Sequence, residues 1–359
     1  MKMLFTIDDF TALSLRLNLL LSVRPVDWRA VLSCMFARQL PSEAEARMLE
    51  TLYYLEDAYG EQKRKVGTPA ILHPIRSSAI LARAHDSINT LDSLTSLLHD
   101  KDEDILSNGY SADRWCVLEE RFGRLINKIE NRQDKWFLNE RIHFLARSGN
   151  ESYNTYLTRL FRQAKETPEL IRVKLADRLD NTLDLRLDFH DQTEDINFYH
   201  IIFRVLFDQK YRGLNVHGHH PSINKIHGAR RLYEIFKNFS LFSILHSDNV
   251  TLDEASVWLL HSIANASIKE AQNVLVHIFA YHLKSLEDQR KIVRKYLDFS
   301  SAGDVSGDNR ALAVLIRNTF EHEDRNAREV SLDGLYRDKT RMVEVAMAFI
   351  VLFSNYLYE

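Results

Sequence analysis

Residues that break helices are scarce in this chain, and their scarcity constrains its fold more than any other feature. The 359 residues include only 11 glycines and 6 prolines. Because these two residue types are the most destabilising in a helix interior, long uninterrupted helices are expected. The sequence has no extended alternation of apolar and polar residues with paired turn signals, the pattern that would indicate strands. It therefore predicts an all-α fold.

Apolar residues recur at helical spacing along the whole chain, which places them on one face of each expected helix. Examples are Leu91, Leu94, Leu97 and Leu98; Leu157, Leu160 and Phe161; and Val274, Leu275, Ile278 and Phe279. Turn-forming residues gather at few places, and residues 213–221 are the best candidate linker. We therefore expect a helical domain over residues 1–200 and a second helical domain over residues 222–359.

Bulk composition excludes several classes of function. A net charge of -3 offers no polycationic surface, which argues against general nucleic-acid binding. Cys34 and Cys116 provide neither a disulfide framework nor a set of zinc ligands, and they suit a reducing cytoplasm. The chain meets Asp8 and Asp9 before any long apolar run, so no signal peptide is expected. The apolar stretch 345–353 is shorter than the roughly 20 residues that span a bilayer. A cytoplasmic protein without membrane segments is predicted.

Three segments far apart in the sequence contain the residue types of a divalent metal site. His73 lies in Ile-Leu-His-Pro-Ile, His99 and Asp100 form a dyad after Leu-Leu, and Asp177 lies in Lys-Leu-Ala-Asp-Arg. Imidazole and carboxylate ligands together suit Mn²⁺, Fe²⁺ or Zn²⁺. Neighbouring residues of one helix point about 100° apart, so both members of the dyad reach one ion only where helices meet. The other ligands must then come from other helices.

A second pair of carboxylates follows the dyad. Glu103 is four residues after His99, and Asp104 is four residues after Asp100, so both are expected one helical turn beyond the ligands. There they could position and deprotonate an attacking water. Each piece alone has a structural explanation, such as a solvated helix end for this pair or a surface ion pair for Asp177. Their joint occurrence, in order and within apolar helical segments, favours a site.

From residue 44 to residue 187, the order of these motifs resembles the HD hydrolase domain of RelA/SpoT enzymes and of the small alarmone hydrolases. The most specific parts are Arg-Lys-Val-Gly-Thr-Pro at 64–69, Ile-Leu-His-Pro at 71–74 and Val-Lys-Leu-Ala-Asp-Arg-Leu-Asp-Asn at 173–181. The resemblance implies one bound Mn²⁺ and hydrolysis of the 3′-pyrophosphate from ppGpp. It also implies an HD-type helical bundle for the domain over residues 1–200, and a purine nucleotide as the partner of the site.

The same resemblance assigns roles to individual residues. The implied metal ligands are His73, His99, Asp100 and Asp177. Glu103 and Asp104 would orient and activate the attacking water. The implied substrate contacts are Arg64, Lys65 and Asn181, with the two cations against the nucleotide and the amide on its sugar or base.

Four positions depart from the usual pattern of that family. Val66 replaces a small polar residue, Ala70 an aromatic one, Asp180 a common histidine and Asp184 a threonine or similar residue. These positions are expected to line the nucleotide side of the pocket rather than the metal. We therefore expect an intact hydrolytic site with weaker discrimination between guanine and adenine.

Two further motifs are weaker. Residues 190–195 repeat the His-Asp-x-x-Glu-Asp spacing, but no apolar helical run precedes them. The histidines at 217, 219, 220 and 227 have no carboxylate or thiolate at ligand spacing, so a polar interdomain loop is expected.

In the second half of the chain, Arg230, Arg231 and residues 284–295 are expected to form solvated mixed-charge faces. These helices could regulate the hydrolase, mediate homo-oligomerisation or bind a protein partner.

Two alternative functions remain open. An HD phosphohydrolase acting on another purine nucleotide is suggested by Val66, Ala70 and Asp184. The other is a nucleotide-sensing or partner-binding protein with a vestigial HD site. The intact set of ligands argues against the second, because buried charges are costly to keep without a role.

Overall fold

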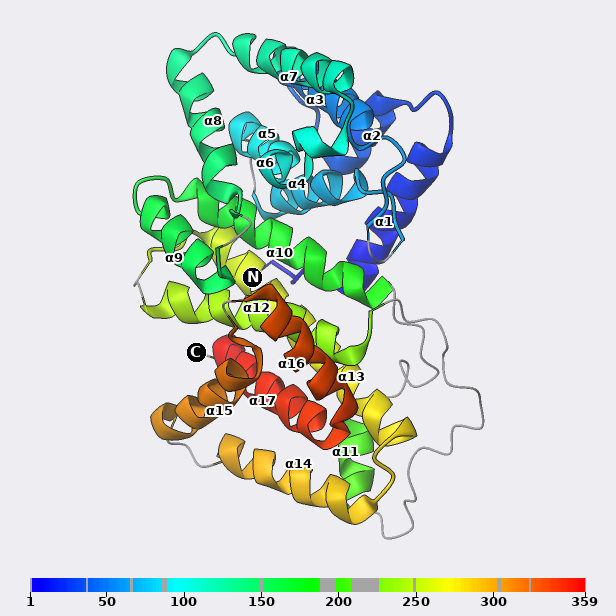
Figure 1. Cartoon of the computed structure of the whole chain (residues 1–359), viewed down its shortest axis with the longest axis vertical. Helices are drawn as coiled ribbons and strands as arrows, with labels where there is room; N and C mark the ends of the chain where they lie inside the picture. The colour runs from blue at the N-terminus through cyan, green and yellow to red at the C-terminus, as the bar shows by residue number, and fades with distance from the viewer. Residues whose placement is uncertain are drawn as a thin grey trace. The chain divides into compact units, whose positions relative to one another are not determined.

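The structure of the protein is a computed structural model. It covers residues 2–36, 38–64, 67–85, 89–148, 151–187, 198–207, 226–247, 250–301, 305–322 and 324–358. Within these ranges the regular elements are the helices α1 to α17 (Figure 1) and one short 3-10 helix. The β pairing among the described residues is an isolated bridge between Lys63 and Pro69. The all-α prediction is confirmed. Predictions on Lys65, Val66, residues 190–195, the linker 213–221 and its three histidines fall outside the described ranges.

The chain forms two compact units. The first contains Met1–Leu183 and Ile244–Ser262, and the second contains Asp184–Ser243 and Ile263–Glu359. Within the first unit, the amide of Phe5 donates to Ser262 Oγ at 3.1 Å, and Trp258 Nε1 donates to the carbonyl of Met3 at 2.8 Å. These bonds hold residues 244–262 against the amino-terminal segment. The expected division into one domain over residues 1–200 and another over residues 222–359 stays a prediction.

The first unit is built from short amphipathic helices around two central ones. Its elements are α1 (Ile7–Ser22), α2 (Trp28–Met35), α3 (Ser42–Tyr59), α4 (Leu72–Ala84), α5 (Thr90–Leu98), α6 (Lys101–Asp104), η1 (Ser107–Gly109), α7 (Ala112–Asn127), α8 (Arg132–Leu145), α9 (Tyr153–Ala164) and α10 (Glu169–Leu187) as far as Leu183. Side-chain oxygens cap several helix starts, at Thr6, Asp27, Asn89, Ser111, Asn131 and Ser152. Helix α4 packs along α5, with α1 and α2 also on α4 and with α3 and α8 on α5.

The second unit has an aromatic core. It contains α11 (Phe198–Phe207), α14 (Leu286–Ser301), α15 (Val305–Phe320), α16 (Arg325–Arg337), α17 (Lys339–Tyr358) and most of α12 (Gly228–Ser247) and α13 (Glu254–Tyr281). The ring of Phe320 stacks on Phe236 at 5.5 Å and on Phe349 at 6.0 Å between centroids. Such pairs add to the burial that holds α12, α15 and α17 together.

Helix α17 is long and apolar enough to cross a membrane by length and composition alone, over Lys339–Leu357. It extends beyond the apolar stretch 345–353 on which the sequence argument relied. In the structure, 56% of its most apolar window is buried inside the protein, and the helix packs against α14, α15 and α16. This is the environment of a core helix of the second unit.

The expectation of a solvated face at Arg230 and Arg231 is wrong for Arg231. Its side chain is 1% exposed, and Nη1 donates to Glu270 at 2.9 Å and to the carbonyl of Leu185 at 2.6 Å. The arginine is buried because a carboxylate on α13 compensates its charge, a partner that helical periodicity does not reveal. At the start of α12, His227 Nδ1 accepts a hydrogen bond from the amide of Arg230 at 3.4 Å, so this histidine caps the helix.

Candidate metal centre

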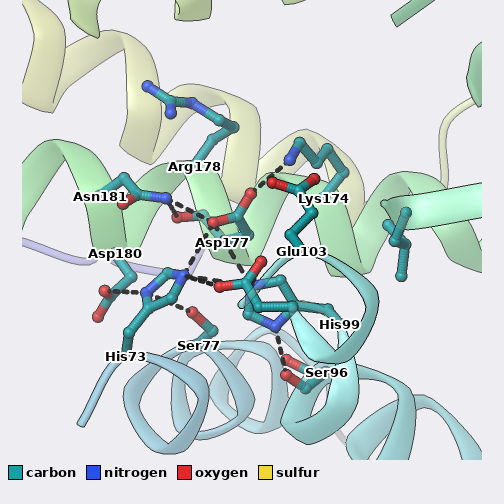
Figure 2. Close-up of polar contacts among 12 residues, drawn as sticks. His73, Ser77, Ser96, His99, Glu103, Lys174, Asp177, Arg178, Asp180 and Asn181 are labelled. Atoms are coloured by element: carbon teal, nitrogen blue, oxygen red, sulfur yellow. Dashed lines mark hydrogen bonds and ion pairs between the residues drawn. The ribbon is translucent and has the colours of Figure 1, made fainter. Parts of the chain in front are cut away.

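Four side chains from three parts of the first unit converge on one point. Figure 2 labels three of them, His73, His99 and Asp177, and the fourth, Asp100, contacts both histidines. His73 lies in the first turn of α4, where Pro74 is tolerated because the first helical N–H groups have no intrahelical partner. His99 and Asp100 follow the last residue of α5. Asp177 lies in the middle of α10, which is buried on almost every side. Residues separated by about a hundred positions in sequence thus share one site.

The ligand atoms of these side chains face one another at short range. His73 Nε2 lies 3.2 Å from His99 Nε2, 3.2 Å from Asp177 Oδ1 and 3.3 Å from Asp100 Oδ2. His99 Nε2 lies 3.2 Å from Asp100 Oδ1 and 3.6 Å from Asp177 Oδ1. Asp100 therefore bridges the two imidazoles with its two oxygens.

These separations fit a single metal ion. Ligand atoms placed about 2.1 Å from one ion lie about 3.0 Å apart in an octahedron and about 3.4 Å apart in a tetrahedron. The group His73, His99 and Asp177 has ligand atoms within 4.8 Å of one another, and all three residues are buried. Nitrogen and carboxylate donors together suit Mn²⁺, Fe²⁺ or Zn²⁺, and the donor set does not single out one of them.

The sequence argument assumed that His99 and Asp100 lie on one helix, but in the structure they lie between two helices. Helix α5 ends at Leu98, and α6 begins at Lys101 with Asp100 as its N-terminal flanking residue. The amides of Glu103 and Asp104 both donate to the carbonyl of Asp100, at 3.1 Å and 2.8 Å. His99 and Asp100 form the turn between the two helices, and from there both side chains reach the same point.

Hydrogen bonds on the far side of each imidazole fix which nitrogen faces the cluster. His73 Nδ1 lies 2.6 Å from Asp180 Oδ2, and His99 Nδ1 lies 2.7 Å from the carbonyl of Ser96. A carboxylate and a carbonyl only accept, so both Nδ1 atoms carry the proton. The lone pair of each neutral ring is then on Nε2, which faces the centre.

Helix α10 supplies a row of polar groups on the side of the cluster. Lys174, Asp177 and Asn181 are spaced by three and four residues and share one helix face (Figure 2). Lys174 Nζ lies 2.7 Å from Asp177 Oδ2, while Asn181 Nδ2 donates to Oδ1 of the same carboxylate. Because Oδ2 is taken by the lysine, Oδ1 is the oxygen that meets the histidines. Arg178 points away from the cluster.

Asp180 does not line the nucleotide side of a pocket, so the prediction for this position is wrong. Its side chain is 0% exposed, and it lies behind His73. Arg76 donates to it twice, from Nε at 2.7 Å and from Nη2 at 3.2 Å, and Arg76 itself lies over the ring of Phe10. An aspartate is tolerated at this buried position because arginine and histidine satisfy its oxygens. Asp184, the other departure, is also buried.

Of the three expected substrate contacts, Arg64 and Asn181 are described, and they contact each other. Arg64 Nη2 donates to Asn181 Oδ1, and Arg64 Nη1 lies 3.3 Å from Asp180 Oδ2. The side chain of Arg64 is 22% exposed. It therefore lies at the edge of the cluster with part of its guanidinium open to solvent, in a short turn closed by the bonds between Arg64 and Thr68 and between Gln62 and Ala70.

Glu103 and Asp104 lie beside the cluster in different surroundings. Glu103 Oε1 accepts from the amide of Arg147 at 2.6 Å, and burial raises the pKa of this carboxyl although Lys174 lowers it. Asp104 keeps an exposed edge and lies 3.5 Å from the hydroxyl of Tyr59. Partial burial and the charge of Asp100 raise the pKa of Asp104 to about 6. Both carboxyls thus bind protons more readily than ordinary surface carboxyls.

The cluster as a whole attracts positive charge. Burial and the charge of Arg64 both lower the pKa of His73, yet Asp180, Asp100 and Asp177 outweigh them and raise it to about 10. Burial raises the pKa of Asp100, but the adjacent histidines bring it down to about 2. The potential that holds a proton on a buried imidazole would equally favour a metal cation.

Comparison with known proteins gives a distant, partial match. A scan against protein-family models finds no match. The chain is 29% identical over 136 residues to the guanosine-3′,5′-bis(diphosphate) 3′-pyrophosphohydrolase of Aquifex aeolicus (strain VF5). The matched stretch covers 37% of this chain but only 17% of the relative, so the chain spans less than a fifth of that protein's length. This similarity supports, at most, a hydrolase family of the RelA/SpoT type.

Sequence reasoning gave no role to two charged residues around the cluster, Arg76 and Lys174, and it misplaced a third, Asp180. Their signal was their position within apolar helical segments. Arg76 is three residues after His73, while Lys174 and Asp180 flank Asp177 at three residues on either side. Charged residues are rarely buried unless they are paired, so this spacing could have marked them as partners of the ligands.

Proposed function

We propose that this chain is a metal-dependent phosphohydrolase that removes the 3′-pyrophosphate from ppGpp-type alarmones. The observation that carries the proposal is the convergence of two imidazole nitrogens and two carboxylates at the spacing of ligands around one ion. The partial similarity to a ppGpp pyrophosphohydrolase supports the substrate class. We assign the metal to His73, His99, Asp100 and Asp177, with Mn²⁺ as the expected ion.

The reaction breaks the bond between the 3′-oxygen and its phosphorus, and water supplies the new oxygen on phosphorus and the proton on the 3′-oxygen. When bound, the ion supplies Lewis acidity to the phosphoryl group and lowers the pKa of water. Glu103 and Asp104 orient the attacking water and accept its proton, and their raised pKa values suit this task. Arg64 and Lys65 meet the nucleotide, and Asn181 contacts its sugar or base.

A panel of nucleotides tests the substrate assignment. The Mn²⁺-loaded protein is expected to release pyrophosphate from ppGpp, and from its adenine counterpart at a comparable rate because Ala70 offers no aromatic surface to the base. Released pyrophosphate and phosphate are measured for ppGpp, the adenine counterpart and the common purine triphosphates. Release from a purine triphosphate alone would favour the other HD phosphohydrolase function. No release from any nucleotide, with metal bound, would favour a sensing role.

Replacing Arg64 by alanine is expected to raise KM for ppGpp roughly tenfold or more, a loss of about 1.4 kcal/mol. Guanidinium groups stack on purines and pair with phosphate, and this one is partly open to solvent at the edge of the cluster. Lys63→Ala is the matched control, because Lys63 is an exposed cation one residue away. Equal KM values for the Arg64→Ala and Lys63→Ala proteins would show that Arg64 does not bind the substrate.

A further inference from the structure

Asp180 occupies a position from which it can control the metal site without touching the metal. It lies three residues after Asp177 on α10, is 0% exposed, and accepts the hydrogen bond of His73 Nδ1 at 2.6 Å. The Nε2 atom of the same ring faces the other three candidate ligands. One imidazole thus connects this buried carboxylate to the centre.

The contacts of Asp180 divide between its two oxygens. Oδ1 accepts from Arg76 Nε at 2.7 Å. Oδ2 accepts from His73 Nδ1, from Arg76 Nη2 at 3.2 Å and from Arg64 Nη1 at 3.3 Å. Arg76 is fully buried and is itself held by the ring of Phe10 and by Ser14 Oγ at 3.5 Å. The arginine therefore fixes the orientation of the carboxylate, and the carboxylate fixes the plane of the imidazole.

We propose that Asp180 is a positioning residue that presents His73 Nε2 to the metal, with Arg76 as its counter-ion. This inference rests on the proposed function, because it requires a metal at the cluster. A carboxylate on the outer nitrogen of a histidine ligand fixes the tautomer, orients the ring and strengthens its electron donation. The second ligand, His99, has only the carbonyl of Ser96 at the equivalent place. Asp180 therefore makes His73 the stronger donor of the two.

The test measures the affinity for Mn²⁺ by isothermal titration calorimetry. It compares the unaltered chain with its Asp180→Asn and Asp92→Asn variants. Asp92 is a matched control, because it is a buried aspartate of the same unit that pairs with Arg141 at 3.0 Å and Arg172 at 3.0 Å, away from the cluster. Both variants lose a buried ion pair and should be less stable. Only Asp180→Asn is expected to weaken Mn²⁺ binding, by roughly 10- to 100-fold.

If Asp180→Asn does not fold, the double variant Asp180→Asn, Arg76→Gln replaces it, since it leaves no uncompensated buried charge. The same loss of affinity is expected. On the unaltered chain loaded with Zn²⁺, histidine nitrogen NMR should show His73 with its proton on Nδ1 and its lone pair on Nε2. This signature is expected to persist in Asp92→Asn.

The outcomes separate the two proposals. Unchanged Mn²⁺ affinity in a folded Asp180 variant would overturn the positioning role and leave the hydrolase proposal standing. A proton on Nε2 of His73 in the Zn²⁺-loaded chain would overturn the positioning role together with the assignment of His73 as a ligand. A wild-type chain that binds no divalent ion would overturn both. A merely structural role for Asp180 predicts lower stability with unaltered metal affinity, as in the control.

Discussion

The Asp100→Ala protein is expected to lose its metal and its hydrolytic activity together. Asp100 bridges the two imidazoles, with Oδ1 at 3.2 Å from His99 and Oδ2 at 3.3 Å from His73. Its removal takes away one of the two carboxylate ligands and leaves Asp177 alone to offset the charge of a divalent ion. We expect Mn²⁺ affinity to fall by roughly 100-fold or more, about 2.7 kcal/mol, with pyrophosphate release at background.

The control for this variant is Asp102→Ala. Asp102 lies on α6, two residues after Asp100, and pairs with Lys101 at 3.4 Å, and its side chain is 33% exposed. The Asp102→Ala protein should keep both its affinity for Mn²⁺ and its rate of pyrophosphate release. Metal content is measured after dialysis, and pyrophosphate release is measured on the same samples. If Asp100→Ala retained wild-type affinity for Mn²⁺, the assignment of Asp100 as a ligand would be wrong.

The second large effect is expected in Glu103→Gln, which should lower kcat by roughly 10²- to 10⁴-fold while metal occupancy is unchanged. Glu103 is assigned to the attacking water rather than to the ion, and its carboxylate is held by the amide of Arg147. Glutamine keeps an oxygen for that amide but cannot accept the proton. Asp104→Asn should behave in the same way.

Steady-state kinetics and metal analysis on the same preparations distinguish these roles. A loss confined to kcat, with unchanged metal content, supports proton transfer by the second carboxylate pair. Asp102→Asn is the control here, because it removes a neighbouring charge without a role at the cluster. Metal loss in Glu103→Gln as severe as in Asp100→Ala would instead make Glu103 a ligand.

The all-α fold and the convergence of distant segments on one site could be predicted, because each follows from a pattern among neighbouring residues in the sequence. Few glycines and prolines indicated helices, and helices are what the described residues form. Apolar periodicity around His73, His99 and Asp177 indicated that these polar residues face inward. The HD-type bundle itself, the division into domains at residues 200 and 222 and the individual roles of the site residues stay predictions.

Other features depend on tertiary partners that spacing does not reveal. The dyad at His99 and Asp100 was expected on one continuous helix, but the chain breaks between α5 and α6. Asp180 was expected beside the nucleotide, yet Arg76 from another helix compensates its burial. Arg231 was expected in solvent, and Glu270 makes its burial tolerable. For Asp180 and Arg231, the partner that makes burial tolerable is distant in sequence, so spacing could not reveal it.

The most direct test of the central claim is a titration of metal-stripped protein with Mn²⁺ while pyrophosphate release from ppGpp is followed. The cluster offers one set of ligands within 4.8 Å among the described residues. Activity should be absent in excess chelator, rise with added metal and reach its plateau at about one ion per chain. Full activity in the presence of chelator, or no pyrophosphate release when one ion is bound, would contradict the proposed metal-dependent alarmone hydrolase.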